Sequence, residues 1–85
     1  MMYFVYILQS EKDGSYYIGH TSNLAERIER HNQGRSGYTK GKMPWKVIYH
    51  EAYRSKSEAM KREQEIKGKK GREYIDYLVR ASPGR

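Results

Sequence analysis

Hydrophobic residues near the start of the chain follow a strand pattern. Residues 3–8 form an apolar run rich in aromatic and β-branched side chains, and residues 16–19 form a second such run. Between the two lies Asp13-Gly14, a pair that favours a tight turn. Because aromatic and β-branched residues fit a pleated, half-buried surface, the pattern predicts a β-hairpin.

The next segment changes to helical spacing. At about 100° per residue, one stripe of a helix contains Leu24, Ala25, Ile28, His31 and Asn32. Thr21 or Ser22 can cap the start of this helix, and Gly34 can end it in the left-handed conformation. The pattern predicts a helix over about residues 22–33. We interpret His31 on this apolar stripe as a hydrogen-bonded core histidine rather than a catalytic one.

Periodicity disappears after this helix and returns in a third strand. Residues 34–44 contain three glycines, a proline and three basic residues, and we predict a mobile basic loop there. Residues 45–53 are again rich in aromatic and β-branched side chains, which predicts a strand. Strict alternation along that strand places Trp45, Val47, Tyr49 and Tyr53 on one face.

Two helices complete the predicted fold. Ser55 and Glu58 have the spacing of a capping box, which begins a helix that runs to about Lys67. After Gly71, a short third helix packs as a lid with its apolar residues Tyr74, Ile75, Leu78 and Val79. The predicted order is β-β-α-β-α-α, an α+β fold with a small three-stranded antiparallel sheet flanked by helices.

A carboxylate interrupts the apolar face of the helix that follows Ser55. Ala59, Met60 and Ile66 define that face, and the same rotation places Glu63 in its middle. Burying an unpaired charge is strongly unfavourable, so Glu63 is expected to be paired, protonated or bound to a metal. The alternative is that the helix is slightly rotated, or that the Glu63 side chain extends to an arginine.

Composition limits the classes of protein that the chain can belong to. Its 85 residues suffice for one small domain, which we expect over residues 1–80, with 81–85 as a loose tail. The absence of cysteine excludes disulfides, zinc fingers and thiol nucleophiles. An aromatic content of 13% argues against disorder. We find no apolar run long enough to cross a membrane and expect a cytoplasmic protein.

The net charge of +7 is concentrated in basic clusters. Clusters of this kind attract polyanions such as nucleic acids, although a solvated surface that keeps the protein soluble is an equally good interpretation of charge alone. The residues of the first cluster are Arg35, Lys40, Lys42 and Lys46, and those of the second are Lys67, Lys69, Lys70 and Arg72.

The remaining reactive residues suit phosphodiester cleavage. The sequence contains neither a phosphate-binding P-loop nor an HExxH metal motif, and its histidines lack the spacing of metal ligands. Tyrosine, arginine and a helix-borne glutamate are left. A phenol can accept a proton from water, a guanidinium can neutralise a phosphate, and a carboxylate can hold a divalent cation.

The order of these residues resembles that of a known nuclease family. Phe4-Val5-Tyr6 is followed by Tyr17-Ile18-Gly19, then by Arg27 on the first predicted helix and Glu63 on the second. This set, which spans residues 3 to about 70, resembles the GIY-YIG nuclease domain and in particular its short stand-alone bacterial members. Phe4 replaces the first glycine of the motif, and His20 stands where other members often carry lysine.

The resemblance implies an endonuclease site with one Mg²⁺ or Mn²⁺ ion. Tyr6 would be the general base, Tyr17 would hydrogen-bond near the nucleophile, and Arg27 would clamp the scissile phosphate. Glu63 would hold the metal. Gly19 would let the backbone approach the phosphate, and His20 could assist proton transfer.

The expected substrate is DNA, single-stranded or branched, because so small a domain offers little surface for following a duplex. Alternatives are a non-catalytic module that binds DNA or RNA, and an interaction domain of a DNA repair complex. The resemblance also implies that a protein partner could supply the choice of target.

Overall fold

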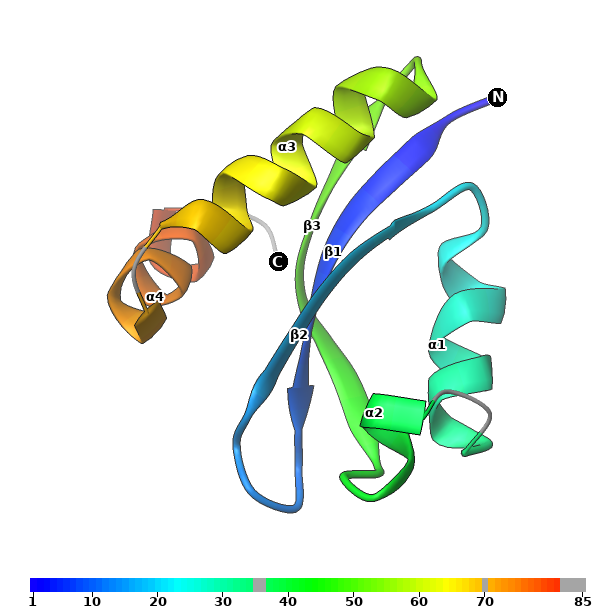
Figure 1. Cartoon of the computed structure of the whole chain (residues 1–85), viewed down its shortest axis with the longest axis vertical. Helices are drawn as coiled ribbons and strands as arrows, with labels where there is room; N and C mark the ends of the chain where they lie inside the picture. The colour runs from blue at the N-terminus through cyan, green and yellow to red at the C-terminus, as the bar shows by residue number, and fades with distance from the viewer. Residues whose placement is uncertain (35–36, 70, 82–85) are drawn as a thin grey trace.

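The computed structural model describes residues 1–34, 37–69 and 71–81. The predictions made for Arg35, for Lys70 and for the tail beyond residue 81 lie outside these ranges. The chain forms, in order, β1 (Tyr3–Ser10), β2 (Tyr16–Thr21), α1 (Leu24–Asn32), α2 (Gly37–Lys40), β3 (Trp45–Tyr53), α3 (Lys56–Gly68) and α4 (Gly71–Ala81) (Figure 1).

The three strands form one antiparallel sheet in the order β2-β1-β3. The central strand β1 carries the apolar run at the start of the chain, and its residues Val5, Tyr6, Ile7 and Leu8 are all fully buried. The predicted turn between β1 and β2 is confirmed, with Gly14 at a φ of +78°. The α+β fold with a three-stranded antiparallel sheet is therefore confirmed.

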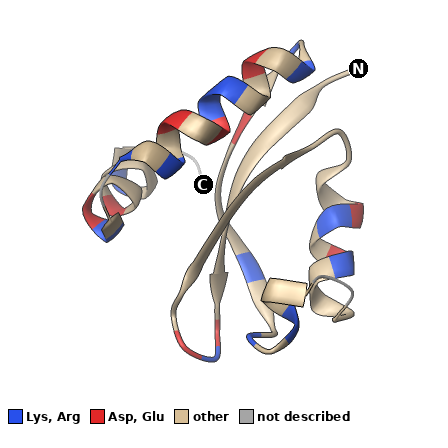
Figure 2. Cartoon of the chain, viewed as in Figure 1, with Lys and Arg blue, Asp and Glu red and all other residues tan. Residues whose placement is uncertain are grey.

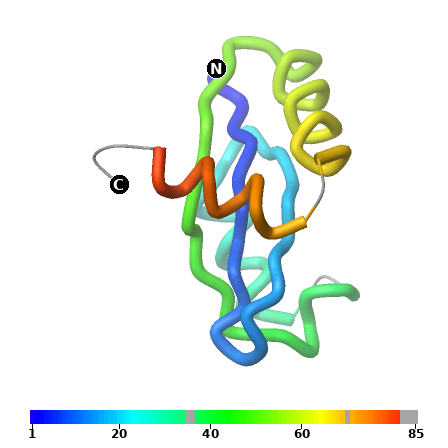
Figure 3. Tube along the Cα trace, turned by 90° about the vertical axis from the view of Figure 1, so that its left-hand side faces the viewer, coloured from blue at the N-terminus to red at the C-terminus, as the bar shows by residue number. Residues whose placement is uncertain are grey.

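Helices cover the sheet on both faces, which explains why β1 is apolar throughout (Figures 1 and 3). One face packs against α3 and α4 through a core that includes Val5, Ile7, Ala59, Ile66 and Leu78. The other face packs against α1 and α2 through a smaller core whose buried members are Tyr6, Leu8 and Trp45.

A β-bulge in β3 changes the face that its side chains present. Ile7 pairs with Tyr49 whereas Leu8 pairs with Val47, so Ile48 is the extra residue. The prediction of one continuous apolar face on this strand is therefore wrong. Its members divide between the two cores: Trp45 and Val47 pack on the α1 face, and Tyr49 and Tyr53 pack on the α3 and α4 face.

The structure corrects the predicted start of α1. Asn23, rather than Thr21 or Ser22, caps this helix, because its side chain accepts the Glu26 backbone N–H. The Thr21 side chain instead accepts the backbone N–H of Asn23, the cap residue itself, at 3.1 Å. The predicted cap of α3 is confirmed, since Ser55 accepts the Glu58 backbone N–H at 3.2 Å.

The predicted basic loop contains a short helix, α2. Thr39 in α2 is fully buried, its hydroxyl lies 2.8 Å from His31 Nδ1, and its carbonyl accepts the Trp45 indole N–H at 2.9 Å. These tertiary contacts hold a segment that has no helical periodicity of its own. The description of residues 34–44 as a structureless loop is therefore wrong for Gly37–Lys40.

Candidate active site

Tyr6 and His31 form a buried pair beneath α1. The Tyr6 hydroxyl lies 3.3 Å from His31 Nε2, and His31 Nδ1 lies 2.8 Å from the Thr39 hydroxyl. Tyr6 and Thr39 are fully buried and His31 is 2% exposed. A side chain from β1, one from α1 and one from α2 are thus joined in one hydrogen-bonded row. The predicted hydrogen-bonded core environment of His31 is present, and its partner is the predicted catalytic phenol.

Burial shifts the pKa values of both members of this pair toward their neutral forms. Desolvation, helped by the nearby Tyr17, raises the pKa of Tyr6 to about 12 although the charge of Arg27 opposes the shift. Desolvation and the charges of Arg27 and Arg30 lower the pKa of His31. Near neutral pH the pair is therefore a neutral phenol beside a neutral imidazole that can accept its proton.

Gly19 is required by the position of Tyr6. The two residues face each other across β1 and β2, and a Cβ on Gly19 would lie 2.7 Å from the Tyr6 hydroxyl oxygen. Such a contact is too short for any other residue without displacement of the buried phenol. This packing requirement differs from the close approach to phosphate that the sequence resemblance implies for Gly19.

Tyr17 lies at the centre of an aromatic cluster on the α1 face of the sheet. Its ring centroid is 4.8 Å from that of His31 and 6.3 Å from that of Tyr6. The Tyr38 ring, which is 57% exposed, stacks on Tyr17 at 6.0 Å. Tyr17 therefore connects the buried Tyr6–His31 pair with an aromatic ring at the surface.

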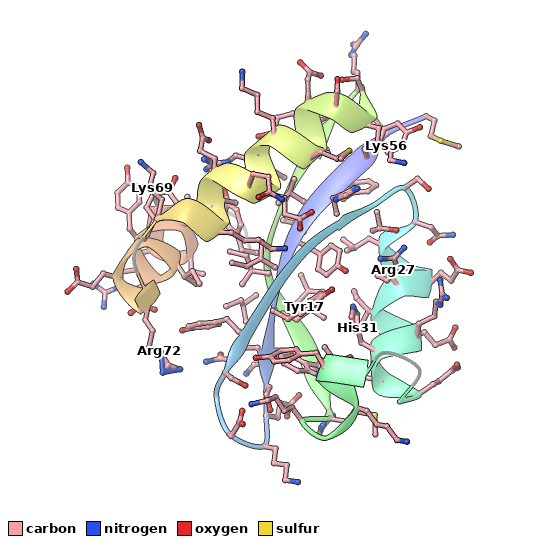
Figure 4. All side chains as sticks on the ribbon, viewed as in Figure 1. Tyr17, Arg27, His31, Lys56, Lys69 and Arg72 are labelled. Carbon is pink, nitrogen blue, oxygen red and sulfur yellow. The ribbon has the colours of Figure 1, made fainter. Side chains whose placement is uncertain are left out.

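Arg27 brings an unsatisfied donor to this side of the molecule. Its side chain and that of His31 point from α1 toward the sheet, where Tyr17 projects from β2 (Figure 4). Arg27 Nε is buried and has no hydrogen-bond partner among the described residues. Arg27 borders a cavity of about 380 Å³ that is also lined by Tyr3, His20, Thr21, Ser22, Glu26 and Lys56. A buried N–H without a partner is costly, and an anionic oxygen entering the cavity would satisfy it.

Glu63 is buried, as its place on the apolar face of α3 predicts. It is 8% exposed, His20 Nδ1 donates to its Oε1, and Lys67 Nζ lies 2.6 Å from its Oε2. Burial alone would raise the pKa of Glu63, but the hydrogen bonds from His20 and Lys67 outweigh it and lower the pKa. The carboxylate is therefore ionised and paired, which answers the question that its position in the sequence raised.

The predicted basic clusters are divided by the fold. Lys and Arg residues are spread over α1, the strand ends and α3 rather than gathered in one patch (Figure 2). Lys42 Nζ is 3.0 Å from Asp13, and Lys46 follows Trp45 and so points to the opposite face of β3. Lys40 is exposed on α2. By contrast, the structure brings Lys67, Lys69 and Arg72 together around one cavity.

Sequence reasoning missed the link from Tyr6 to Thr39 and the role of Tyr38. The available signal was the spacing of Arg27 and His31, four residues apart and thus on one helical face. The contacts of Thr39 were not predictable from the sequence, because they depend on how α2 packs beneath α1. Within the described residues no group of three or more His, Asp or Glu side chains is placed to hold a metal ion.

Comparison with known proteins agrees with this geometry. The family model for the GIY-YIG catalytic domain matches residues 2–75, which is most of the chain. The chain belongs to the GIY-YIG family. This assignment confirms the resemblance seen in the sequence, and it places the protein in a family of nucleases.

Similar proteins include short relatives of the same kind. A UPF0213 protein of Staphylococcus aureus strain Mu3 is 47% identical over 66 residues, which cover 76% of this chain and 79% of the relative. UPF0213 proteins of S. aureus strains Mu50 and N315 match to the same extent. The solution NMR structure of a UPF0213 protein from Bacillus halodurans is 38% identical with a TM-score of 0.62, covering 99% of this chain and 88% of that one. The GIY-YIG domain thus belongs to the short, stand-alone type.

Proposed function

We propose that this GIY-YIG domain is a divalent-metal-dependent endonuclease that hydrolyses phosphodiester bonds in DNA. The observation that carries the proposal is the convergence of Tyr6, Arg27 and Glu63. The charges of Arg27 and Glu63 both act on the pKa of the Tyr6 phenol, and His20 joins Glu63 to the cavity that Arg27 borders. A proton acceptor, a phosphate-binding cation and a metal-binding carboxylate are the parts that such hydrolysis needs.

Tyr6 and His31 together provide the proton acceptor. With a pKa of about 12, Tyr6 is not ionised at neutral pH, so it can take a proton only by giving one up. As the attacking water loses its proton to the Tyr6 oxygen, the Tyr6 hydroxyl proton passes to His31 Nε2. The two transfers accompany the attack on phosphorus, since a separate phenolate–imidazolium pair would be unfavourable at this buried position.

Arg27 binds the scissile phosphate, and Tyr17 orients the nucleophile. The unpartnered Arg27 Nε donates to a phosphoryl oxygen, whose charge grows in the transition state. Tyr17 is half-buried beside the same imidazole, which makes it the second phenol within reach of the attacking water. His20 holds the Glu63 carboxylate in place and would assist proton transfer there.

Glu63 fits a metal site completed by the substrate. Mg²⁺ prefers oxygen ligands, keeps several waters and is often bound through one or two carboxylates plus substrate phosphate. Glu63 is an ionised carboxylate whose partner Lys67 is half-exposed and can swing away from it. A bound Mg²⁺ or Mn²⁺ ion would stabilise the leaving oxygen when the bond to phosphorus breaks.

A non-catalytic nucleic-acid-binding module is the second candidate. The observation in its favour is that both Glu63 oxygens already have cationic or hydrogen-bonding partners, His20 and Lys67. In that case the lowered pKa of Glu63 would reflect structural pairing, and RNA would be as suitable a ligand as DNA.

The cellular setting belongs to the same proposal. No helix in the described part of the chain is long and apolar enough to cross a membrane. We infer action on unpaired or branched DNA in the cytoplasm during repair, with a protein partner choosing the target.

A direct cleavage assay tests the proposal. Purified protein is incubated with end-labelled single-stranded, forked and duplex DNA in Mg²⁺, Mn²⁺ or EDTA. We expect cleavage of the single-stranded and forked substrates with metal, and none with EDTA. Binding without cleavage in every metal would support the non-catalytic module instead.

A further inference from the structure

Two cavities lie along the β2 edge of the sheet, one on each side of the His20–Glu63 pair. A lower cavity of about 510 Å³ is bordered by Tyr16 and Ile18 of β2 and by Ile66 and Lys67 of α3. The cavity beside Arg27, here called the upper cavity, is bordered by His20 and Thr21 of β2 and by Lys56 of α3. The order of the lining residues along both β2 and α3 places Glu63 between the two cavities.

The lining of the lower cavity has more basic than acidic side chains among the described residues. Lys69 and Arg72 border it with Lys67, and Asp13, its one acidic lining residue among those described, is paired with Lys42 at 3.0 Å. The Arg72 guanidinium lies 4.9 Å from the centre of the Tyr16 ring and donates to the Gly14 carbonyl at 2.6 Å. These contacts hold a planar cation at the wall of the cavity, where a phosphate can bind it.

The same cavity contains an aromatic surface that faces outward. Tyr38 borders the cavity, is 57% exposed, and has its ring supported from behind by Tyr17. Lys42 Nζ lies 5.5 Å from the same ring. An exposed ring with a rigid support and a nearby cation is the arrangement on which an unpaired base stacks.

The upper cavity is also lined by basic side chains. Arg27 and Lys56 enter it from α1 and α3, with Glu26 as its one acidic side chain among the described lining residues. Figure 4 shows Lys56 at one end of α3 and Lys69 and Arg72 near the other end, with Tyr17 and Arg27 on the side of β2 that faces α1.

We infer that the β2 edge is a track for a single DNA strand, which runs through both cavities and carries the scissile phosphate past Glu63. This inference rests on the proposed function, because it deepens its substrate class. From Tyr16 to Thr21 a strand rises about 17 Å at ~3.4 Å per residue, enough for several stacked nucleotides. A base stacked on Tyr38 must be unpaired, so the strand entering the lower cavity is single.

Binding measurements test the track without relying on cleavage. Fluorescence anisotropy follows a labelled single-stranded oligothymidylate binding to the protein in EDTA. Two variants probe the lower cavity. Tyr38→Ala removes the ring on which a base would stack, and the double substitution Lys69→Gln with Arg72→Gln removes positive charge. Lys69→Gln alone is included, since Arg72→Gln also removes a bond to the hairpin. The charge-matched control is Arg54→Gln with Lys61→Gln, two exposed residues outside both cavities.

The two kinds of substitution should weaken DNA binding in different ways. Tyr38→Ala should raise the Kd at least fivefold, the lower end of about 1–3 kcal/mol for one stacked base, with an unchanged salt dependence. Lys69→Gln with Arg72→Gln should raise the Kd and flatten the slope of log affinity against log salt by about 1.4, or 0.7 for each phosphate contact. Lys69→Gln alone should flatten it by half as much.

Specific binding results would contradict the inferred single-strand track. An unchanged Kd in Tyr38→Ala, or an equal loss in the Arg54 and Lys61 control, would show that binding is non-specific charge attraction. An equal effect of Tyr38→Ala on duplex binding would remove the single-strand assignment. Absence of cleavage by the wild type, with these binding effects intact, would reject the endonuclease function and leave the track standing.

Discussion

At the scale of single residues, the central finding is that Tyr6, the proposed proton acceptor, is hydrogen-bonded to a buried histidine. Tyr6 is recognisable in the sequence through the spacing of the aromatic tripeptides, and Glu63 through its place on an apolar helical face. The partnership of Tyr6 with His31 was not predictable, because it depends on how α1 packs over β1. For the same reason, the need for Gly19 became clear only with its cross-strand position opposite Tyr6.

The Tyr6–His31 pair predicts a particular pH dependence of cleavage. The pKa of His31 is lowered from 6.5, so the imidazole is neutral and able to accept a proton throughout the neutral and alkaline range. We expect the single-turnover rate to be nearly constant from about pH 7 to about pH 9 and to fall only at a more acidic pH than the ordinary histidine value, where His31 becomes protonated. His31→Gln and Tyr6→Phe should both be severely impaired.

If prior ionisation of Tyr6 were required instead, the rate would keep rising, about tenfold per pH unit, toward its pKa of about 12. A rate of that form would remove His31 from the proton path. Binding of DNA in EDTA serves as the control, because neither substitution should change it greatly.

Replacement of Gly19 tests the contact with the phenol. Gly19→Ala places a methyl group where the Tyr6 hydroxyl lies, so we expect a loss of about 1–3 kcal/mol in the free energy of unfolding by urea. Gly68→Ala is the matched control, since a Cβ there meets nothing within 4 Å and alanine favours the helix. Equal stability of the two variants would mean that Tyr6 moves aside freely.

At the scale of elements, the orientation of α3 is set by a second, partly buried ion pair. Arg62, the neighbour of Glu63 in the sequence, binds both oxygens of Glu51 on β3 at 2.9 and 3.0 Å. The hydroxyls of Tyr49 and Tyr53 also donate to Glu51. Because Arg62 faces β3 while Glu63 faces β2, this pair fixes the rotation that aims Glu63 at the candidate site.

Loss of the pair should therefore affect both stability and metal binding. Arg62→Met should lower the free energy of unfolding by about 2 kcal/mol, the scale of hydrogen bonds to a charged group, and should weaken Mn²⁺ binding measured by electron paramagnetic resonance. Lys61→Met, an exposed change one residue earlier, should alter neither. Unchanged Mn²⁺ affinity in a destabilised Arg62→Met would show that α3 is oriented by its apolar face alone.

The elements also show where sequence patterns stop being informative. The caps, turns and apolar periods of β1, β2 and α3 are local and were recognisable from the sequence, except that Met60, predicted on the apolar face of α3, is exposed. The bulge at Ile48 and the short helix α2 were not, because each depends on partners far along the chain: β1 for the bulge, and His31 and Trp45 for Thr39 in α2. Of these two features, α2 carries Tyr38, whose ring stacks on Tyr17.

At the scale of the whole molecule, the candidate site combines side chains from four elements. Tyr6 comes from β1, Tyr17 from β2, Arg27 from α1 and Glu63 from α3. The fold class was predictable because the element order leaves few ways to bury both faces of so small a sheet. The division of the basic residues was not, since it depends on where α3 and α4 pack.

The most direct test of the account compares single-turnover cleavage of a single-stranded oligonucleotide by the wild type and by Glu63→Gln at saturating protein with Mg²⁺. Glu29→Gln, an exposed carboxylate on α1 outside both cavities, is the matched control. The expected result is a rate lower by at least about a hundredfold in Glu63→Gln, with DNA affinity retained and with Glu29→Gln close to wild type. A Glu63→Gln variant that cleaves at the wild-type rate would contradict it.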